Sequence, residues 1–314
     1  MEHNTKPTES ARKDWQSGNG EQGNGSCTGI CIFENASVSA KADEAGVRDN
    51  MDGMVCEGGG EKGKRGGVLV AVATYNEIEN LPLLVRRIAE MVPGTDILIV
   101  DDSSPDGTGR WAADLASRHP HFHLIERSGK NGLGAAVLEA FRYAIRNGYE
   151  YLVNLDADFS HPPEKIPEIL AAAKGTDGAP PCDVAIGSRY AKGGKIDGWP
   201  LARRVMSRCI NAYARLLLGL PTRDNSGAFR CYRVTILEKI DFGSIRSRGY
   251  SFFEEVLFRL RRAGATFREV PITFTDRVRG TSKINRKEAA TALAIIFRIG
   301  LERIVPGSNG KKRQ

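Results

Sequence analysis

The sequence predicts an α/β fold in which a mainly parallel sheet carries helices on both faces. Two observations support this prediction. From about residue 65 onward, short apolar runs rich in Val, Ile and Leu alternate with segments of helical periodicity. The first of these runs also end abruptly in polar or acidic residues. Because open α/β sheets bind ligands at the carboxyl ends of their strands, we expect the chemistry at that edge.

The first half of the folded region predicts four strands with helices between them. An apolar run over 67–73 ends at Thr74, and helical periodicity begins near Asn80. The same order then repeats, with strands predicted over 96–100, 122–125 and 151–155 and helices over 80–91, 108–118 and 135–147. Since parallel strands need a crossover connection, this alternation favours a parallel sheet.

The second half is less regular. It predicts helices over 164–174, 201–220, 234–239, 249–263 and 286–305 and strands over 183–186 and 267–274. The 201–220 helix combines one apolar stripe with Arg203, Arg204, Arg208 and Arg215. Both a surface helix packed on its own core and a helix lying on a membrane surface account for this pattern.

Charge divides the chain into unlike parts. Residues 1–64 hold 7 Lys and Arg against 11 Asp and Glu, which leaves 38 against 27 from the totals of 45 and 38. We therefore expect a disordered tail over 1–64, a basic folded domain over 65–285, an amphipathic helix over 286–306 and a basic tail over 307–314. A basic domain attracts anionic partners such as nucleic acid, anionic membranes or phosphorylated small molecules.

Several features predict a cytoplasmic protein in peripheral contact with the cytoplasmic membrane face. The first thirty residues lack the apolar core of a signal peptide, and the six cysteines lack C-x-x-C spacing. The apolar run of the final helix is broken by Arg298 and Glu302, short of the roughly 20 residues that span a bilayer. We expect the contact through this helix and the 201–220 helix.

Asp156 and Asp158 follow the apolar run 151–155 with one residue between them. Residues i and i+2 of an extended segment point the same way, so both carboxylates can reach one divalent cation. Mg²⁺ usually takes one or two protein carboxylates together with substrate phosphate oxygens. An Asp-x-Asp pair also arises by chance in such a chain, so its position after a strand is what favours a metal site.

Nine short stretches together identify a family resemblance. In order they are Ala73-Thr-Tyr-Asn-Glu77, Val100-Asp-Asp-Ser-Ser-Pro-Asp-Gly-Thr108, Lys130-x-Gly-Leu-Gly134, Asp156-Ala-Asp158, His161-Pro-Pro-Glu164, Gly187-Ser-Arg-Tyr190, Asp224-x-Ser-Gly227, Gly249-Tyr-x-Phe252 and Asp276-Arg-x-x-Gly-x-Ser-Lys283. The region 66–300 resembles the polyprenol-phosphate (dolichol-phosphate) mannosyltransferases of glycosyltransferase family 2, which have the GT-A fold. Ala73 stands where proline is common, and we expect this change to be harmless.

The resemblance implies a site for a nucleotide sugar and a metal. Its nucleotide-sugar residues would be Thr74, Tyr75, Glu77, Asp101, Asp102, Lys130, Asp156 and Ala157. Asp156, Asp158 and Ser160 would bind Mg²⁺ or Mn²⁺. For Glu77 an acid placed favourably at a helix start is an alternative interpretation.

On the acceptor side, the resemblance implies that Arg189, Arg203 and Ser207 hold the lipid phosphate. Arg204 is adjacent to Arg203, which leaves the register open by one residue, and a solvated surface charge is the other interpretation of each helix arginine. The implied catalytic residues are Asp158, Arg189, Arg277 and Lys283. The last two would stabilise the departing nucleoside diphosphate.

The implied reaction is inverting transfer of mannose from GDP-mannose to a polyprenyl or dolichyl phosphate. A phosphate monoester is already an anion, so it can attack without a general base, which leaves Asp224 and Glu255 without a necessary basic role. UDP-glucose as donor, a sugar hydroxyl as acceptor, or a non-enzymatic module binding nucleic acid or phospholipid are the alternatives. We expect no nucleic-acid partner, because acidic strand ends would repel its backbone. A separate membrane-anchoring protein is a further possible partner.

Overall fold

The computed structural model describes residues 67–129, 132–176, 178–247, 249, 251–276 and 286–304. The predicted tails over 1–64 and 307–314 lie outside these residues. So do Lys130, Arg277 and Lys283, which the family resemblance places in the site.

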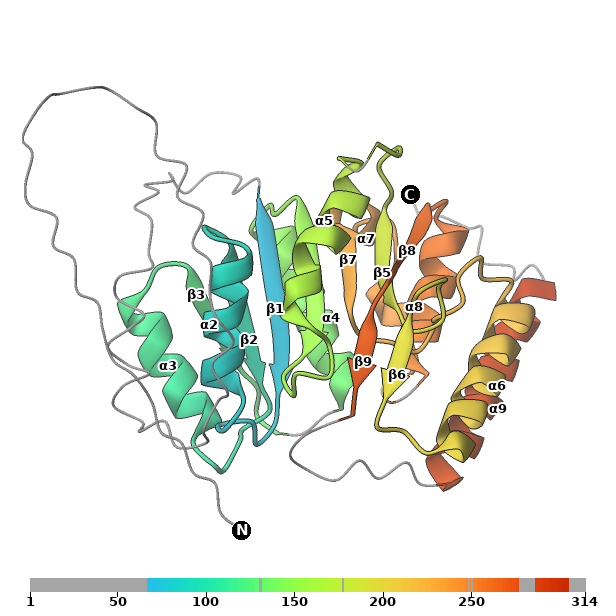
Figure 1. Ribbon diagram of the computed structural model, residues 1–314, viewed down its shortest axis with the longest axis horizontal. Helices are drawn as coiled ribbons and strands as arrows, with labels where there is room; N and C mark the ends of the chain where they lie inside the picture. The colour runs from blue at the N-terminus through green and yellow to red at the C-terminus, as the bar shows by residue number, and fades with distance from the viewer. Residues whose placement is uncertain are drawn as a thin grey trace, which may run out of the picture. The chain divides into compact units, whose positions relative to one another are not determined.

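A seven-stranded sheet with the order β3-β2-β1-β4-β7-β5-β8 forms the centre of the fold (Figure 1). Its strands are β1 (Val68–Thr74), β2 (Asp96–Asp101), β3 (Phe122–Glu126), β4 (Tyr151–Asp156), β5 (Val184–Ser188), β7 (Arg230–Arg233) and β8 (Phe267–Pro271). Every pairing is parallel except those of β7, which runs antiparallel to both β4 and β5. The predicted α/β class with a mainly parallel sheet is confirmed.

Helices cover both faces of the sheet, because successive strand residues point to opposite sides. Val70 and Val72 pack into one hydrophobic core with α2 (Leu81–Met91), α3 (Thr108–Arg118) and α5 (Ile166–Lys174). Leu69 and Ala71 pack into the other core with α4 (Leu133–Arg146), the short α7 (Val234–Leu237) and α8 (Phe252–Arg262). Short 3-10 turns at Pro163–Lys165 and Phe242–Ser244 complete these layers.

Two long helices pack side by side at one end of the sheet: α6 (Leu201–Leu218) and α9 (Arg286–Ile304) (Figure 1). Gly300 of α9 lies against Leu217 of α6, where an added Cβ would come within 3.3 Å of the leucine Cβ. Among the described helices, none combines the length and the low charge needed to cross a bilayer.

Three short strand segments differ from the sequence expectation. The segment predicted as one strand over 267–274 is interrupted at Ile272 into β8 and β9 (Thr273–Thr275), and β9 pairs with β6 (Lys195–Asp197). The sequence around β6 predicted only a glycine-rich loop, and that of β7 only a polar stretch. In β7 the arginines hide the strand pattern, because fully buried Arg230 is accommodated by bonds to backbone carbonyl oxygens.

Candidate active site

The parallel register brings the predicted strand-end residues to one edge of the sheet. Thr74 of β1 pairs with Asp101 of β2, and Ala73 pairs with Asp156 of β4. Residues separated by up to about eighty positions in the chain therefore lie on adjacent strands at the carboxyl edge. This is the edge at which the sequence predicted ligand binding.

Asp101 is buried and shapes the turn that follows β2. Its carboxylate accepts hydrogen bonds from Thr74 Oγ1 at 2.8 Å, from Ser104 N at 2.9 Å and from Ser104 Oγ at 2.6 Å. The neighbouring Asp102 is also buried and forms an ion pair of 2.6 Å with Arg127, which follows β3. Of these two predicted nucleotide-sugar residues, Asp101 thus holds the loop while Asp102 joins two strand ends.

Tyr75 and Glu77 lie in the loop after β1. The Tyr75 side chain is exposed, and Glu77 Oε2 accepts a hydrogen bond of 2.8 Å from Asn80 Nδ2. Asp106 ties this loop to the next one, since it accepts bonds from Ile78 N and from both Thr108 N and Oγ1. Burial favours the neutral acid, but these donors hold the pKa of Asp106 below its ordinary value.

Asp156, Ala157, Asp158 and Ser160 form a tight turn at the end of β4. Ser160 donates from N (3.1 Å) and from Oγ (2.6 Å) to Asp158 Oδ1, and the turn needs a positive φ of 58° at Phe159. Two carboxylates and a hydroxyl within five residues are oxygen ligands suited to Mg²⁺ or Mn²⁺. The described residues contain no group of three or more His, Cys, Asp or Glu side chains placed to hold one metal ion, so this turn offers two carboxylates and the Ser160 hydroxyl.

His161 packs directly behind this turn. Its Nδ1 accepts a hydrogen bond of 3.2 Å from the backbone N of Asp156, and its ring lies 5.5 Å from those of Phe229 and Phe274. Burial lowers the pKa of His161 below its ordinary value, although Asp156 and Asp158 act in the opposite direction. The sequence included His161 in a motif without giving it a role; the structure places it as a neutral support of the aspartate turn.

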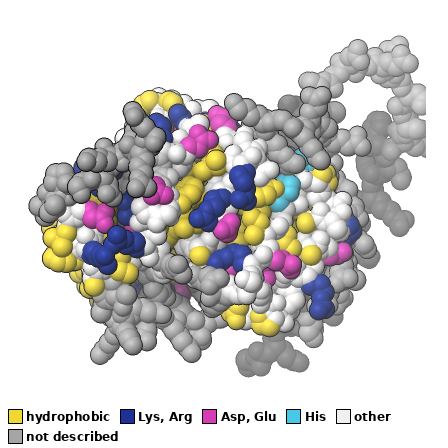
Figure 2. All heavy atoms as spheres, turned by 180° about the vertical axis from the view of Figure 1, so that it is seen from behind, with side chains coloured by type: hydrophobic (Ala, Val, Ile, Leu, Met, Phe, Trp, Pro, Cys, Tyr) yellow, Lys and Arg dark blue, Asp and Glu magenta, His cyan; other side chains and the backbone are white. Residues whose placement is uncertain are grey.

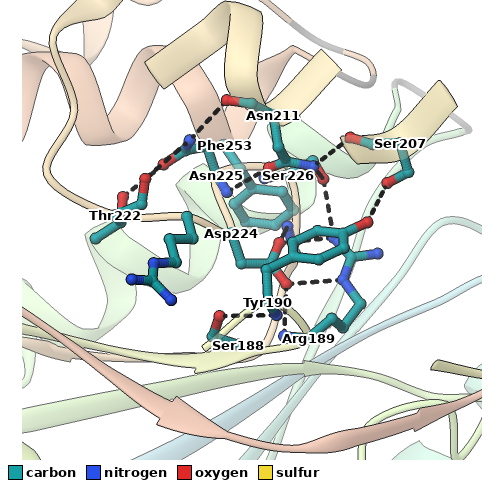
Figure 3. Close-up of polar contacts among 12 residues, drawn as sticks. Ser188, Arg189, Tyr190, Ser207, Asn211, Thr222, Asp224, Asn225, Ser226 and Phe253 are labelled. Carbon is teal, nitrogen blue, oxygen red and sulfur yellow. Dashed lines mark hydrogen bonds and ion pairs between the residues drawn. The ribbon is translucent and has the colours of Figure 1, made fainter. Parts of the chain in front are cut away.

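Arg189, predicted to bind the acceptor phosphate, forms a buried two-bond fork with Asp224 (Figure 3). Nε donates to Oδ2 at 2.7 Å and Nη2 to Oδ1 at 2.6 Å, while the backbone N of Arg189 also donates to Oδ2. Burial alone would raise the pKa of Asp224, but Arg189 holds it below its ordinary value, and Asp224 in turn raises the pKa of Arg189. Both groups are therefore charged.

A network of amides and hydroxyls fixes the segment around Asp224 (Figure 3). Asn211 of α6 accepts from Asn225 N at 2.6 Å and donates to Ser226 Oγ at 3.1 Å. Ser226 Oγ also accepts from Arg189 Nη2 at 2.9 Å. Predicted residue Ser207 accepts from the Tyr190 hydroxyl at 2.7 Å. The structure thus brings Arg189 and Ser207 into one connected group.

Arg203 contacts Asp276, the last described residue before the gap at 277–285. Its Nη1 donates to the two Asp276 carboxylate oxygens at 3.1 and 3.3 Å, and its guanidinium lies 4.0 Å from the centre of the Trp199 ring. Trp199 Nε1 donates to the same carboxylate at 3.2 Å. Arg204, the alternative register, donates instead to the backbone oxygen of Trp199.

Phe274 joins the two sides of the site. Its ring centre lies 5.5 Å from the His161 ring and 5.4 Å from the Arg189 guanidinium carbon. His161 supports the aspartate turn, so Phe274 packs between that turn and the Arg189–Asp224 fork. No sequence signal marks Phe274 as a residue of the site.

Two neighbouring glutamates of α8 differ in their surroundings. Glu255 is bound by Ser247 N and Oγ, Arg246 N and Arg259, which together outweigh burial and lower its pKa. Glu254 is buried, and its Oε2 has no hydrogen-bond partner. Burial raises the pKa of Glu254 to about 8, so near neutral pH it is mostly the neutral acid.

Comparison with known proteins is consistent in sequence and in fold. Residues 69–241 match the family model described as "Glycosyl transferase family 2". The chain is 42% identical over 234 residues to the undecaprenyl-phosphate mannosyltransferase of Micrococcus luteus, covering 74% of this chain and 94% of that protein. It is 44% identical over 234 residues to the polyprenol monophosphomannose synthase of Mycolicibacterium smegmatis, covering 74% and 86%.

A solved structure supports the fold alone. The glucosyl-3-phosphoglycerate synthase of Mycobacterium tuberculosis superposes with a TM-score of 0.52 at 17% identity, covering 80% of this chain and 84% of the other. The likeness therefore extends over the sheet and its helices.

Proposed function

This chain belongs to the polyprenol-phosphate mannosyltransferases of glycosyltransferase family 2, and from this premise we propose that it transfers mannose from GDP-mannose to a polyprenyl phosphate. The packing of Phe274 between His161 and Arg189 carries the proposal most directly. Through His161, Phe274 links the aspartate turn to the Arg189–Asp224 fork, so the two lie close to one another. A donor diphosphate and an acceptor phosphate need such neighbouring sites.

The donor side is assigned to the first four strands. Tyr75, Glu77 and Asp102 hold the base and ribose, with Thr74, Asp101 and Ala157 shaping the loops around them. Lys130 would add a positive charge from the loop after β3. Asp156, Asp158 and Ser160 would hold a bound Mg²⁺ or Mn²⁺, which in such sites neutralises diphosphate oxygens.

The acceptor side is assigned to Arg189, Arg203 and Ser207. The fork with Asp224 engages Nε and Nη2 of Arg189, so we assign the phosphate contact to Nη1. Arg203 is paired with Asp276, the described residue that precedes the segment with Arg277 and Lys283, and we assign these two residues to the departing nucleoside diphosphate.

The surroundings of the buried acids agree with an attack that needs no general base. Asp224 is ion-paired to Arg189, and Glu255 is surrounded by donors, so both carboxylates have lowered pKa values and neither is suited to take a proton. The phosphate oxygen of the acceptor would attack the anomeric carbon as the bond to the diphosphate breaks. A single displacement of this kind inverts the anomeric configuration.

We also propose a peripheral location on the cytoplasmic membrane face, with or without a separate anchoring protein. On α6, Leu201 and Leu216 are 76% and 77% exposed, and on α9 Phe297 is 52% exposed. Large apolar side chains this exposed on two adjacent helices are typical of an interaction surface.

Transfer of labelled sugar tests the proposed reaction. GDP-mannose and UDP-glucose are each offered with a short-chain polyprenyl phosphate in detergent, with Mg²⁺, with Mn²⁺ and with EDTA. We expect mannolipid only from GDP-mannose and only with metal. Product from UDP-glucose alone would contradict the assigned donor, product in EDTA would contradict the metal assignment, and no product from either donor would contradict the reaction.

A further inference from the structure

A groove of about 870 Å³ runs between α6 and the segment that follows β5. On α6 the groove is lined by Arg208, Asn211, Arg215 and Leu216. The first three are three and four residues apart, which places them on one side of the helix, and Leu216 follows Arg215 directly. None of its lining residues is acidic, and four are arginines: Arg189, Arg208, Arg215 and Arg223. The remaining lining residues are neutral. The groove is therefore a concentrated positive surface.

Three of these arginines lack the acidic partner that each arginine of the acceptor side has, among the described residues. Arg189 is paired with Asp224, and Arg203, nearby on α6, with Asp276. Arg208, Arg215 and Arg223 are exposed, and within the described part of the chain none of them has an acidic side chain at ion-pair distance. Like charges gathered without counter-charges are stabilised by bound anions.

The groove is bordered by apolar side chains. Leu216 lines it while being 77% exposed, and Leu201 and Val205 (51% exposed) continue the exposed strip along α6. The adjacent helix α9 adds Leu293, Phe297 and Leu301, spaced by four residues and all exposed. Figure 2 shows the molecule from behind, where hydrophobic, basic and acidic side chains are interspersed. Arginines beside an apolar strip match a phosphate attached to acyl chains better than a soluble anion.

We propose that this groove, formed by Arg208, Arg215 and Arg223 with Leu216, binds the phosphate group of an anionic membrane phospholipid. The proposal rests on the proposed function, because a lipid acceptor brings the enzyme to a membrane. Arg189 lines the groove and belongs to the acceptor side, so the bound phospholipid would lie beside the acceptor phosphate. The groove would thus orient the enzyme on membranes that carry negative charge.

Flotation of the full-length protein with lipid vesicles tests the proposal. Vesicles of phosphatidylcholine are compared with vesicles containing about 30% phosphatidylglycerol, a level at which basic residues near the surface gain measurable affinity. The test variant is R208Q/R215Q/R223Q. The control is R110Q/R146Q/R262Q, which removes the same charge from exposed positions that do not line the groove.

We expect the wild type and the control to bind the anionic vesicles far better than the neutral ones, and the groove variant to lose on the order of 100-fold in partitioning. Equal loss in the control would overturn the proposal in favour of general surface charge. Wild-type-like flotation of the groove variant would overturn it as well. Release by millimolar inorganic phosphate at constant ionic strength would identify a soluble anion site instead.

Transfer in detergent separates this proposal from the proposed function. With short-chain polyprenyl phosphate in neutral micelles, we expect the groove variant to turn over like the wild type. If the wild type transfers nothing there, the proposed function fails whatever the flotation shows. If the groove variant alone loses transfer in neutral micelles, the groove serves the acceptor itself, and the phospholipid proposal is overturned.

Discussion

The proposed donor and acceptor sides of the site are built in different ways. On the donor side, Asp101 and Asp158 each accept from a hydroxyl two or three residues away, Ser104 and Ser160. Asp101 also accepts from Thr74, 27 residues away, and Asp102 pairs with Arg127, 25 residues away. On the acceptor side, Arg189 is held by Asp224, 35 residues away, and Arg203 by Asp276, 73 residues away. The donor-side contacts thus lie within single turns or between the ends of paired parallel strands, whereas the two acceptor-side pairs close longer stretches of chain.

The largest expected effect is on the donor side. Asp158→Ala should lower transfer by a factor on the order of 1,000 or more, because the variant loses a ligand of the proposed metal. Its melting temperature should change little, since the two bonds that Asp158 Oδ1 accepts from Ser160 lie within one turn. Turnover and thermal unfolding are measured beside Asp114→Ala, an exposed carboxylate on α3. Near-wild-type turnover of Asp158→Ala would refute the metal assignment.

On the acceptor side the largest effect should be on stability. Asp224→Ala leaves the Arg189 guanidinium buried without its partner, which typically costs about 3–5 kcal/mol of unfolding free energy. Asp276→Ala breaks a pair whose side chains are 22% and 34% exposed, and should cost about 1 kcal/mol or less. Urea unfolding of both variants gives the comparison. Equal losses would show that the fork is no more important to folding than the half-buried pair between Arg203 and Asp276.

Glu254 should make stability depend on pH. The unfolded chain releases this proton near the ordinary value of 4.5, whereas the folded chain keeps it up to a pKa of about 8. Between these values the folded state binds more protons, so the contribution of Glu254 to stability falls as pH rises, by at most about 1.4 kcal/mol per pH unit. Glu254→Gln cannot titrate, and its stability relative to wild type should therefore rise across this window. Urea unfolding from pH 5 to pH 8.5 measures this, and parallel curves for the two proteins would show that Glu254 does not hold the proton.

The smallest effect should separate two neighbouring arginines. Arg203→Gln should raise KM for the polyprenyl phosphate by about tenfold, as expected for one charged phosphate contact, and leave KM for GDP-mannose nearly unchanged. Arg204→Gln is the matched control, because Arg204 bonds to the backbone oxygen of Trp199. If Arg204→Gln has the larger effect, the acceptor register shifts by one residue. Equal loss in donor affinity would move Arg203 to the other side of the site.

Which strand ends meet at the carboxyl edge could be predicted from the sequence, whereas the packing around Arg189 could not, for a physical reason. Strand ends can be found from apolar runs, and the parallel register then brings Thr74, Asp101 and Asp156 together. No local signal predicts the fork between Arg189 and Asp224. Arg189 follows β5 and Asp224 precedes β7, and the two are brought together by the pairing of β5 with β7, a strand whose sequence is polar. Phe274 and His161 likewise gain their place only from packing.

The surroundings of Asp96, outside the site, show that residue types alone do not locate a catalytic cluster. Asp96 lies at the start of β2, at the opposite edge of the sheet, where its carboxylate contacts His121 Nδ1 at 2.7 Å, His123 Nε2 at 3.3 Å and the Tyr149 hydroxyl. The residue types would suit a catalytic cluster. Their place at the amino edge, where three segments are joined, indicates a role in folding.

The antiparallel direction of β7 has a consequence for how this site can change. The chain leaves the sheet after Ser188 and re-enters it at Arg230, and Gly187 N donates to Phe229 O at 2.9 Å. The whole excursion, which includes α6, the groove and Asp224, thus begins and ends on adjacent strands. Segments with neighbouring ends are the ones that domains exchange or lengthen most readily. Most of the proposed acceptor side, including Arg189, Ser207 and Asp224, therefore lies in one inserted segment, and a replacement of that segment would also have to preserve the pair between Arg203 and Asp276.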